Sequence, residues 1–485
     1  MSFVPPIDPE QSEVFKMYRF NSRKQQGGYA TVLGVILMTT MALSIFSLYD
    51  VGQVTTHKMR GQNASDAAAY SVATFVSRDL NFIATTNRAM VANQVAIGQM
   101  VGLSSYGHMI ERTASNIDII GDIAQFIPYV GPVIKRITAL LEDAAEAMES
   151  AFDKAAKAII PMNELILGFL SVSQTMFHNG MLISSQQVHN KVAKDNDPDI
   201  ESSVVVGAYT VANFISEHNK TLERNTAPSV RGGGRKNPLH LKRYGEFEQV
   251  VKGSQDKFLN TRYTRYIAGT VRGLGGNDFR RRAIRNKYVW EWTAMDTMRV
   301  RVGPCWFGCL LSAPLGWGAG HALNSGSYYN YRRDTRRWGG AWRNSSAAWW
   351  ARRTDSRNNL RRTRSIRPFY DLEEDGLRET GPAMVSILKK PVEPVRTWKE
   401  ASKDIPSYNL QERYDVAKDG GIAKDQMLSI SKAEPYFSRP RDLWRRRDNN
   451  LEYGNLYNPF WQPRLVETSS TERVAVMAAA AGINL

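Results

Sequence analysis

The longest apolar stretch of the chain lies near its N-terminus. No charged residue occurs from Gln25 to Tyr49, between Lys24 and Asp50. In a helix, about 20 such residues cross the roughly 30 Å hydrocarbon core of a bilayer. The run is longer than the apolar core of a cleaved signal peptide, and no A-x-A cleavage site stands immediately behind it. We therefore expect a polar leader at residues 1–24 and one transmembrane helix at residues 25–50.

A second pattern follows the anchor, in the region at residues 51–194, where apolar residues recur at helical spacing. Val76, Ile83, Met90 and Ile97 stand seven residues apart and predict one apolar stripe along a long helix. Such a stripe packs either on the protein's own core or along a partner helix, which makes the four residues candidate interaction positions. Asn87 and Gln94 interrupt the stripe, and a coiled coil tolerates polar residues there only at a cost in stability.

Prolines predict where this helical region is interrupted. The segment from Pro128 to Pro132 predicts a break between two helices, and Pro161 predicts another. A second membrane span around residues 117–134 is disfavoured by Asp118 and Asp122.

Residues 194–199 predict a turn or linker and residues 231–238 a stronger one, after which the composition changes sharply. We expect strands at residues 288–302, 383–389 and 473–477. The predicted fold class is α+β: a single N-terminal transmembrane helix continues into a helical region, and a mixed α+β domain with long basic loops occupies residues 195–485.

The formal charge of +16 belongs to one part of that domain. Residues 231–370 hold 29 Lys and Arg against 8 Asp and Glu, a net charge of +21, so the rest of the chain is slightly acidic. Tryptophans interleave with these arginines, and the candidate interaction residues are Arg332, Arg333, Arg336, Arg337 and Trp338. Arginine with tryptophan suits anionic lipid, acidic polysaccharide, an acidic partner or single-stranded nucleic acid, and it also suits a solvated loop that its tryptophans anchor. Nucleic acid is the least favoured ligand, because no RRM, OB or helix-turn-helix pattern is present.

The chain offers little for catalysis or for binding a metal. Cys305 and Cys309 are the only cysteines, and a C-x-x-x-C pair without neighbouring His is a poor zinc site. Outside the cytoplasm the two form a candidate disulfide; otherwise they are small buried thiols. The seven histidines are scattered, and no H-E-x-x-H, G-x-S-x-G or Walker pattern occurs. We expect no enzyme, no cofactor and no metal.

Three segments in order carry a family resemblance. Residues 25–30 read QQGGYA, the apolar run follows, and residues 61–70 read GQNASDAAAY. This N-terminal region resembles that of TadG-like proteins of the Flp (tight adherence) pilus assembly system. Residues 78–94, 313–318 and 455–462 look like the continuation in the TadG-related subgroup. The Asp-x-Ser-x-Ser metal motif of some relatives is absent, and so is the glutamate that prepilin cleavage would want.

Charge around the anchor predicts its orientation. Lys16, Arg19, Arg23 and Lys24 precede the span, whereas Lys58 and Arg60 follow it. The positive-inside rule then puts the N-terminus in the cytoplasm of a bacterium and the main domain in the periplasm, with the helix in the inner membrane.

The resemblance implies a non-catalytic, single-pass component of Flp type IV pilus assembly, acting as a scaffold or a minor pilus-associated protein. Its partners would be pilin-like or pilus assembly proteins. The alternative is a membrane-tethered nucleic-acid-binding protein whose basic domain lies in the cytoplasm.

Overall fold

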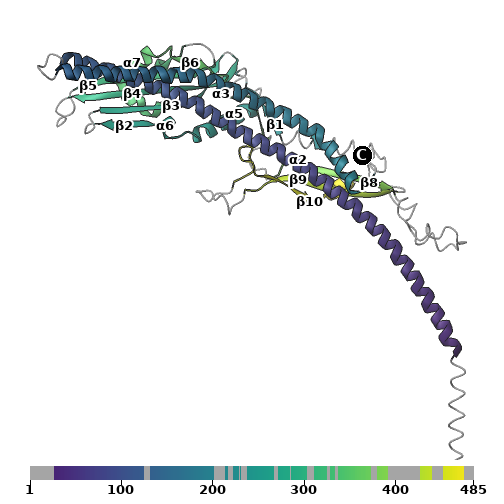
Figure 1. Cartoon of the computed structure of the whole chain (residues 1–485). Coiled ribbons are helices and arrows are strands. Elements are labelled where there is room, and N and C mark those ends of the chain that lie inside the picture. The colour runs from purple at the N-terminus through teal and green to yellow at the C-terminus, as the bar shows by residue number, and fades with distance from the viewer. Residues whose placement is uncertain are drawn as a thin grey trace, which may run out of the picture.

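Two long antiparallel helices form the spine of the protein, and the described sheets lie along it (Figure 1). The computed structural model describes residues 27–124, 131–200, 214–216, 222–228, 230, 238–266, 271–284, 286–302, 311–324, 328–333, 337–372, 380–391, 426–439 and 452–474. Helix α2 spans Gly27–Ala124 and helix α3 spans Gly131–Asn196. Hydrogen bonds from Thr138 to Asp118 and from Gln174 to Asn87 fix the antiparallel register.

Helix α3 continues through Pro161, so the expected break there was wrong. Proline has no N–H, and it therefore leaves the carbonyl of the residue four positions earlier without its helical partner. That residue is Lys157, and its carbonyl oxygen accepts a hydrogen bond from Arg361 Nε at 3.2 Å. A side chain from the C-terminal domain thus replaces the missing bond. The expected break at Pro128 lies outside the described residues.

A five-stranded sheet forms most of the domain at the far end of the spine. Its order is β2-β3-β4-β5-β6, antiparallel except for the parallel pair β5 and β6. The strands are β2 (Arg262–Tyr266), β3 (Val271–Ile284), β4 (Lys287–Val302), β5 (Leu311–Leu323) and β6 (Asn359–Arg362). The basic block therefore supplies the strands of a sheet in addition to loops. The strand expected at residues 288–302 is confirmed as β4.

Two smaller sheets lie nearer the N-terminal half of α2. One has the order β10-β9-β8, from Trp461–Val466, Gln426–Phe437 and Met384–Pro391, and the other pairs β1 (Leu222–Asn225) with β7 (Phe369–Leu372). Strand β8 confirms the strand expected at residues 383–389. Residues 470–474 form a helical turn, so the strand expected from Arg473 was wrong, and residues 475–477 lie outside the described part.

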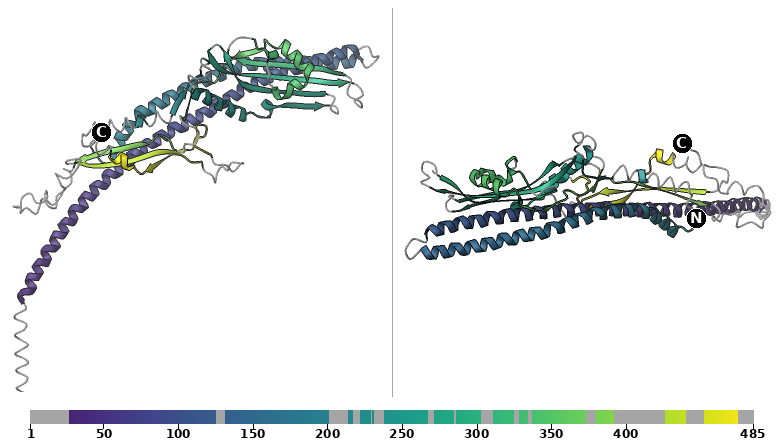
Figure 2. Two further views of the ribbon diagram at one scale, coloured as in Figure 1. Left: turned by 180° about the vertical axis from the view of Figure 1, so that it is seen from behind. Right: turned by 90° about the horizontal axis from the view of Figure 1, so that it is seen from above.

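Short helices complete the domain and give it three layers. They are α5 (Pro238–Gly253), α6 (Lys257–Asn260), η2 (Tyr331–Arg333), η3 (Trp338–Arg343) and α7 (Ser345–Thr354). The right panel of Figure 2 shows the five-stranded sheet between the two long helices on one face and α7 on the other. Glycines allow this close approach: a Cβ at Gly316 would lie 2.5 Å from the Met109 carbonyl oxygen, and one at Gly318 would lie 2.1 Å from that of Ser105.

The apolar stripe of α2 is the centre of the core. Val76, Ile83, Met90 and Ile97 expose at most 1% of their surface. The first two pack in a cluster with Phe437 and Trp461, and the last two in a cluster with Phe279, Trp290 and Trp292. These side chains therefore face the chain's own strands.

The polar residues in the stripe bind backbone carbonyls of the C-terminal domain. Asn87 Nδ2 donates to the carbonyl oxygens of Tyr370 at 3.0 Å and Leu456 at 2.9 Å, while Asn87 Oδ1 accepts from Gln174 Nε2 at 2.7 Å. Gln94 Nε2 donates to Ser365 O at 3.2 Å. Buried carbonyls outside a ladder need such donors, so Asn87 and Gln94 fix the places where the domain sits on α2.

One buried carboxyl group belongs to the two-stranded sheet of β1 and β7. Asp371 on β7 exposes 6% of its surface, and its Oδ1 accepts from Leu372 N at 2.9 Å. Burial raises the pKa of Asp371 to about 6, although the positive charge of Arg243 opposes the shift.

Replacing Ile83 with Asp should unfold the protein at a markedly lower temperature. The new carboxylate would be fully buried without a partner, which costs several kcal/mol, on the order of 3 to 5. Thr85→Asp, two residues further on the same helix and exposed, is the matched control. Thermal unfolding of the full-length protein in detergent measures both. Equal melting temperatures for the two variants would contradict the core assignment.

Replacing Asp371 with Asn should remove part of the pH dependence of stability. A folded-state pKa of about 6 lies above the ordinary value of 3.8, so the folded state holds the proton to higher pH than the unfolded chain does. Stability of the wild type should therefore fall as pH rises from about 4 to about 6, by up to roughly 3 kcal/mol. Denaturant titrations across this range should show a flatter profile for Asp371→Asn. Parallel profiles would show that Asp371 has an ordinary pKa.

Candidate functional site

The N-terminal part of α2 is apolar and has no cover from the described part of the chain. Leu33, Ile36 and Met38 expose 62%, 56% and 76% of their surfaces. The most apolar window of the helix has a mean hydropathy of 2.0, and none of it is buried. Figure 1 shows this end, in purple, projecting away from the domain as a single helix. It has the length and composition of a membrane span, with no break before the helix enters the folded domain.

The part of α2 that follows the apolar segment binds the three-stranded sheet. Gln62 Nε2 donates to Ile430 O at 3.0 Å and to Ser431 Oγ at 2.8 Å, and Asp66 accepts a hydrogen bond from the same Ser431 hydroxyl. Small side chains let the sheet approach, because Ala64 and Ala68 are fully buried. The alanine-rich segment at residues 61–70 is therefore a place where the folded domain holds the helix.

The C-terminal segment with a family resemblance, residues 455–462, binds α2 through asparagines. Asn81 Nδ2 donates to Trp461 O at 2.9 Å, and Trp461 N donates back to Asn81 Oδ1 at 2.9 Å. Asn87 donates to the carbonyl oxygen of Leu456 in the same segment. Both asparagines belong to the 78–94 segment, so two of the segments that resemble the family bind each other.

The remaining segment with a family resemblance, residues 313–318 of β5, is also held on α2. Asn116 Nδ2 donates to Leu315 O at 2.8 Å. Gly318 lies against the backbone of α2 at Ser105, where a larger residue would not fit. Every segment that resembles the family therefore either belongs to α2 or contacts it directly.

Two arginine–aspartate pairs lie where the five-stranded sheet and α7 meet the spine; one pair joins two strands of the sheet, and the other joins α2 to the residue that ends α7. Arg262 Nε and Nη2 donate to the two carboxylate oxygens of Asp296 at 2.6 and 2.8 Å, and Ser105 Oγ on α2 donates to the same carboxylate at 2.7 Å. Arg112 on α2 binds both oxygens of Asp355 at 2.7 Å. Two-point pairs of this kind fix orientation as well as distance.

One group of side chains between the long helices has the residue types of metal ligands. His108 Nε2 lies 3.2 Å from Glu149 Oε1 and 3.6 Å from Asp153 Oδ2. Burial lowers the pKa of His108, but the negative charges of Asp153, Asp355 and Glu149 outweigh it and raise the pKa above its ordinary value. Lys157 also lies 3.6 Å from Asp153. The two carboxylates thus face Lys157 and a histidine whose pKa they raise, an arrangement that fits an ion-pair cluster.

The predicted basic residues have different surroundings. Trp338 is buried, and its Nε1 donates to Thr293 Oγ1 at 3.0 Å, so it belongs to the core. Arg332 and Arg337 are exposed. Arg333 lies in η2, but its side chain is outside the described part, as are Arg336, Cys305 and Cys309. The candidate disulfide therefore stays a prediction.

An exposed surface of arginine and tryptophan lies over η2, η3 and α7, and Arg332 is its one member among the candidate interaction residues of the sequence analysis. Arg332, Trp342, Trp349, Arg352 and Arg353 line a cavity of about 480 Å³ together with Ser345 and Ala348. The Arg353 guanidinium carbon lies 3.9 Å from the Trp349 ring centroid, a cation–π contact. Trp342 and Trp349 expose 46% and 48% of their surfaces. We call the three arginines and two tryptophans the α7 surface.

A signal for this surface exists in the sequence of α7. Ala347, Ala348 and Ala351 are buried on one side of the helix, so Trp349 and Arg353, which are four residues apart, share the other side. The alternation of small and large residues in the sequence therefore separates two faces of α7. Only the packing of the alanines in the structure shows that the face with the large residues is the exposed one.

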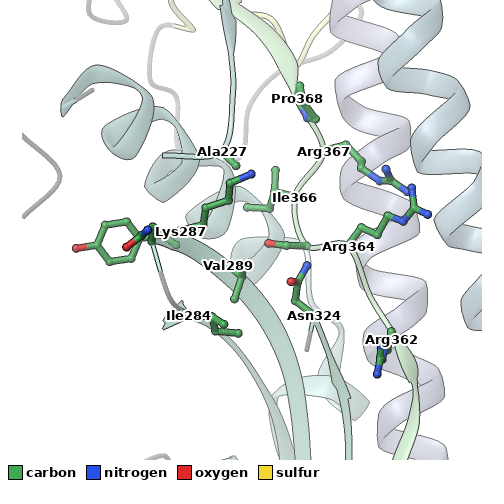
Figure 3. A pocket seen from close by; sticks show the side chains of 13 residues that line it. Ala227, Ile284, Lys287, Val289, Asn324, Arg362, Arg364, Ile366, Arg367 and Pro368 are labelled. Atoms are coloured by element: carbon green, nitrogen blue, oxygen red, sulfur yellow. The ribbon is translucent and has the colours of Figure 1, made fainter. Parts of the chain in front are cut away.

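A second basic cavity lies between the turn that joins β3 to β4 and the segment that follows β6. Its volume is about 870 Å³, and Lys287, Arg362, Arg364 and Arg367 are among its lining residues. Figure 3 shows Lys287 on one side and the three arginines on the other, toward the long helices. Arg367 is engaged by Glu164 at 3.2 Å, so part of this charge is already balanced within the chain.

Comparisons with known proteins give one match. No curated protein and no solved structure matches the chain. A family model described as putative Flp pilus-assembly TadE/G-like matches residues 28–74, which hold the exposed apolar helix and the segment that binds the three-stranded sheet. In these residues the chain carries the sequence pattern of the TadE/G-like family of putative Flp pilus-assembly proteins.

Proposed function

We propose that the protein is a non-catalytic, single-pass membrane component of Flp pilus assembly that carries its mixed α+β domain on a helical stalk. One observation carries the proposal: the exposed apolar segment and the helix on which the domain packs are parts of one uninterrupted helix, α2. The first part of that helix, residues 28–74, matches a pilus-assembly family model. Residues 29–49 would cross the bilayer, since 21 helical residues span about 30 Å. The domain would then act as a scaffold for pilin-like or assembly proteins.

The basic residues before the span support a cytoplasmic N-terminus and a periplasmic domain. In this orientation the membrane is the bacterial inner membrane. The contact between Gly318 and Ser105 lies about 80 Å along α2 from Asp50, so the α7 surface stands far from the headgroups of its own membrane. This distance favours an acidic envelope polysaccharide over anionic lipid as the ligand of the α7 surface.

Charges inside the span should abolish pilus assembly. Val35→Arg combined with Met38→Arg places two cations in the hydrocarbon core, at a cost of about 2.5–3.5 kcal/mol each. A strain without the protein should lose surface Flp pili in electron micrographs, and the double variant should fail to restore them. Thr56→Arg, exposed on the same helix beyond the span, should restore them.

Topology is the companion measurement. Protease added to intact spheroplasts should remove a C-terminal tag, and alkaline carbonate should leave the wild-type protein in the membrane pellet. Pili in the deletion strain, or a tag that is protected until lysis, would contradict the proposal. Protection of the tag would favour the nucleic-acid-binding alternative.

The α7 surface should bind an acidic polysaccharide. Trp349→Ala combined with Arg353→Ala should weaken binding to alginate, a uronic acid polymer, by about ten-fold or more, because a stacking face and a cation are lost together. Both side chains are exposed, so folding should be unchanged. Arg265→Ala, an exposed arginine on β2, is the control for charge alone and should lose less than about two-fold.

Biolayer interferometry of the full-length protein, with neutral dextran as the reference polymer, measures this difference. Equal losses in the two variants, or equal binding to dextran, would remove the ligand assignment. Tighter binding of single-stranded DNA than of alginate would favour nucleic acid instead.

A further inference from the structure

Helix α3 carries a second seven-residue pattern, and this one faces outward. Met162, Phe169, Met176 and Ile183 stand seven residues apart, and Leu165 and Val172 follow the first two by three residues. These six side chains, which we call the α3 stripe, expose between 54% and 76% of their surfaces. Apolar residues at alternating spacings of three and four form the seam of a coiled coil.

The opposite face of the same helix is already occupied by α2. Leu167, Gln174 and His178 are buried there, and His178 Nδ1 lies 2.7 Å from Asp79 Oδ2. The right panel of Figure 2 shows α3 on the side of α2 away from the strands. Within the described part of the chain, the stripe thus has no covering element.

The exposed side chains of the stripe are uncharged, and Glu164, between its first two members, is buried and paired with Arg367. From Leu165 to Asn190 there is no Asp, Glu, Lys or Arg. Asn179, exposed, holds the next position of the pattern, three residues after Met176. A Cβ at the neighbouring Gly180 would have no atom within 4 Å, so another helix can approach closely there.

The anchoring bilayer is not the cover of this stripe. By length and hydropathy α3 would qualify as a span, but its pairing with α2 fixes its height. His178, near the C-terminal end of the stripe, is level with Asp79, about 40 Å along α2 from Asp50. Lipid around residues 29–49 ends well before that level.

The stripe is large enough for a stable protein interface. Judged by residue size and exposure, its six side chains present roughly 700 Å² of apolar surface, close to the approximately 800 Å² per partner of a standard interface. Monomeric proteins rarely leave so large an apolar patch in water.

We propose that the α3 stripe binds the α3 stripe of a second copy of this chain, parallel and in register. In that arrangement every stripe residue meets its own copy, apolar against apolar, over about three heptads. Asn179 meets Asn179, and an amide side chain is self-complementary because it both donates and accepts. A stripe of one charge would repel its own copy, whereas this uncharged stripe does not. The parallel direction rests on the proposed function, in which both anchors enter one membrane.

Cysteine cross-linking tests the pairing and its direction in the full-length protein in membranes. Leu165→Cys and Ile183→Cys, each made alone with Cys305→Ser and Cys309→Ser, should each give a disulfide-linked dimer on oxidation. Both positions lie away from the centre of the stripe, so an antiparallel pair would hold identical residues far apart. Thr85→Cys, exposed on α2 outside the stripe, should stay monomeric.

A second measurement keeps the proposal independent of the cross-links. Phe169→Glu with Met176→Glu should lower the dimer fraction in analytical ultracentrifugation by about ten-fold, with an unchanged circular dichroism spectrum, because both side chains are exposed in the single chain. Thr85→Glu should leave the dimer intact. The proposal would be overturned by a monomeric wild type or by cross-links that form only to another protein. It would also be overturned if a cross-link formed only when the Leu165→Cys and Ile183→Cys variants are mixed, since that would indicate an antiparallel pair. If cross-linking succeeds while carbonate extracts the protein, the anchor fails and the pairing stands.

Discussion

The whole structure depends on the burial of one face of α2. The three-stranded sheet, the five-stranded sheet and α3 all pack on this helix, and residues from Val76 to Ile97 lie at the centre of the contacts. Apolar burial supplies the attraction, but it does not fix position along a helix. Amide side chains do, because Asn81, Asn87 and Gln94 each bind a particular backbone group of a distant segment.

This arrangement couples the domain to the proposed anchor. The helix that carries the exposed apolar segment is the helix on which the domain is built, so no flexible linker separates them within α2. The second long helix stiffens the stalk through an antiparallel contact along most of its length. A domain held in this way keeps a set height and direction above a membrane, which suits a scaffold.

Charge has two different roles in the basic block. Arg262 pairs with Asp296 inside the sheet, where Ser105 of α2 binds the same carboxylate, and Arg112 of α2 pairs with Asp355 at the end of α7. At the α7 surface, arginines lie beside exposed tryptophans. The first group is structural, whereas the second is exposed, and we propose that it binds an acidic ligand. A count of arginines in the sequence cannot separate these roles, because each depends on what lies opposite.

The sequence by itself determined the apolar helix, the long helical region, the α+β class and two strands, because length, absence of charge and residue periodicity are local properties. It did not determine that α3 continues through Pro161, since the replacement donor, Arg361, is distant in the sequence. The tertiary structure alone decided that the Val76 to Ile97 stripe is core while the α3 stripe is exposed, and that Trp338 is buried while Trp349 is not. Two helical faces with the same spacing differ only in which one meets the strands, and that choice is made by contacts between residues hundreds of positions apart.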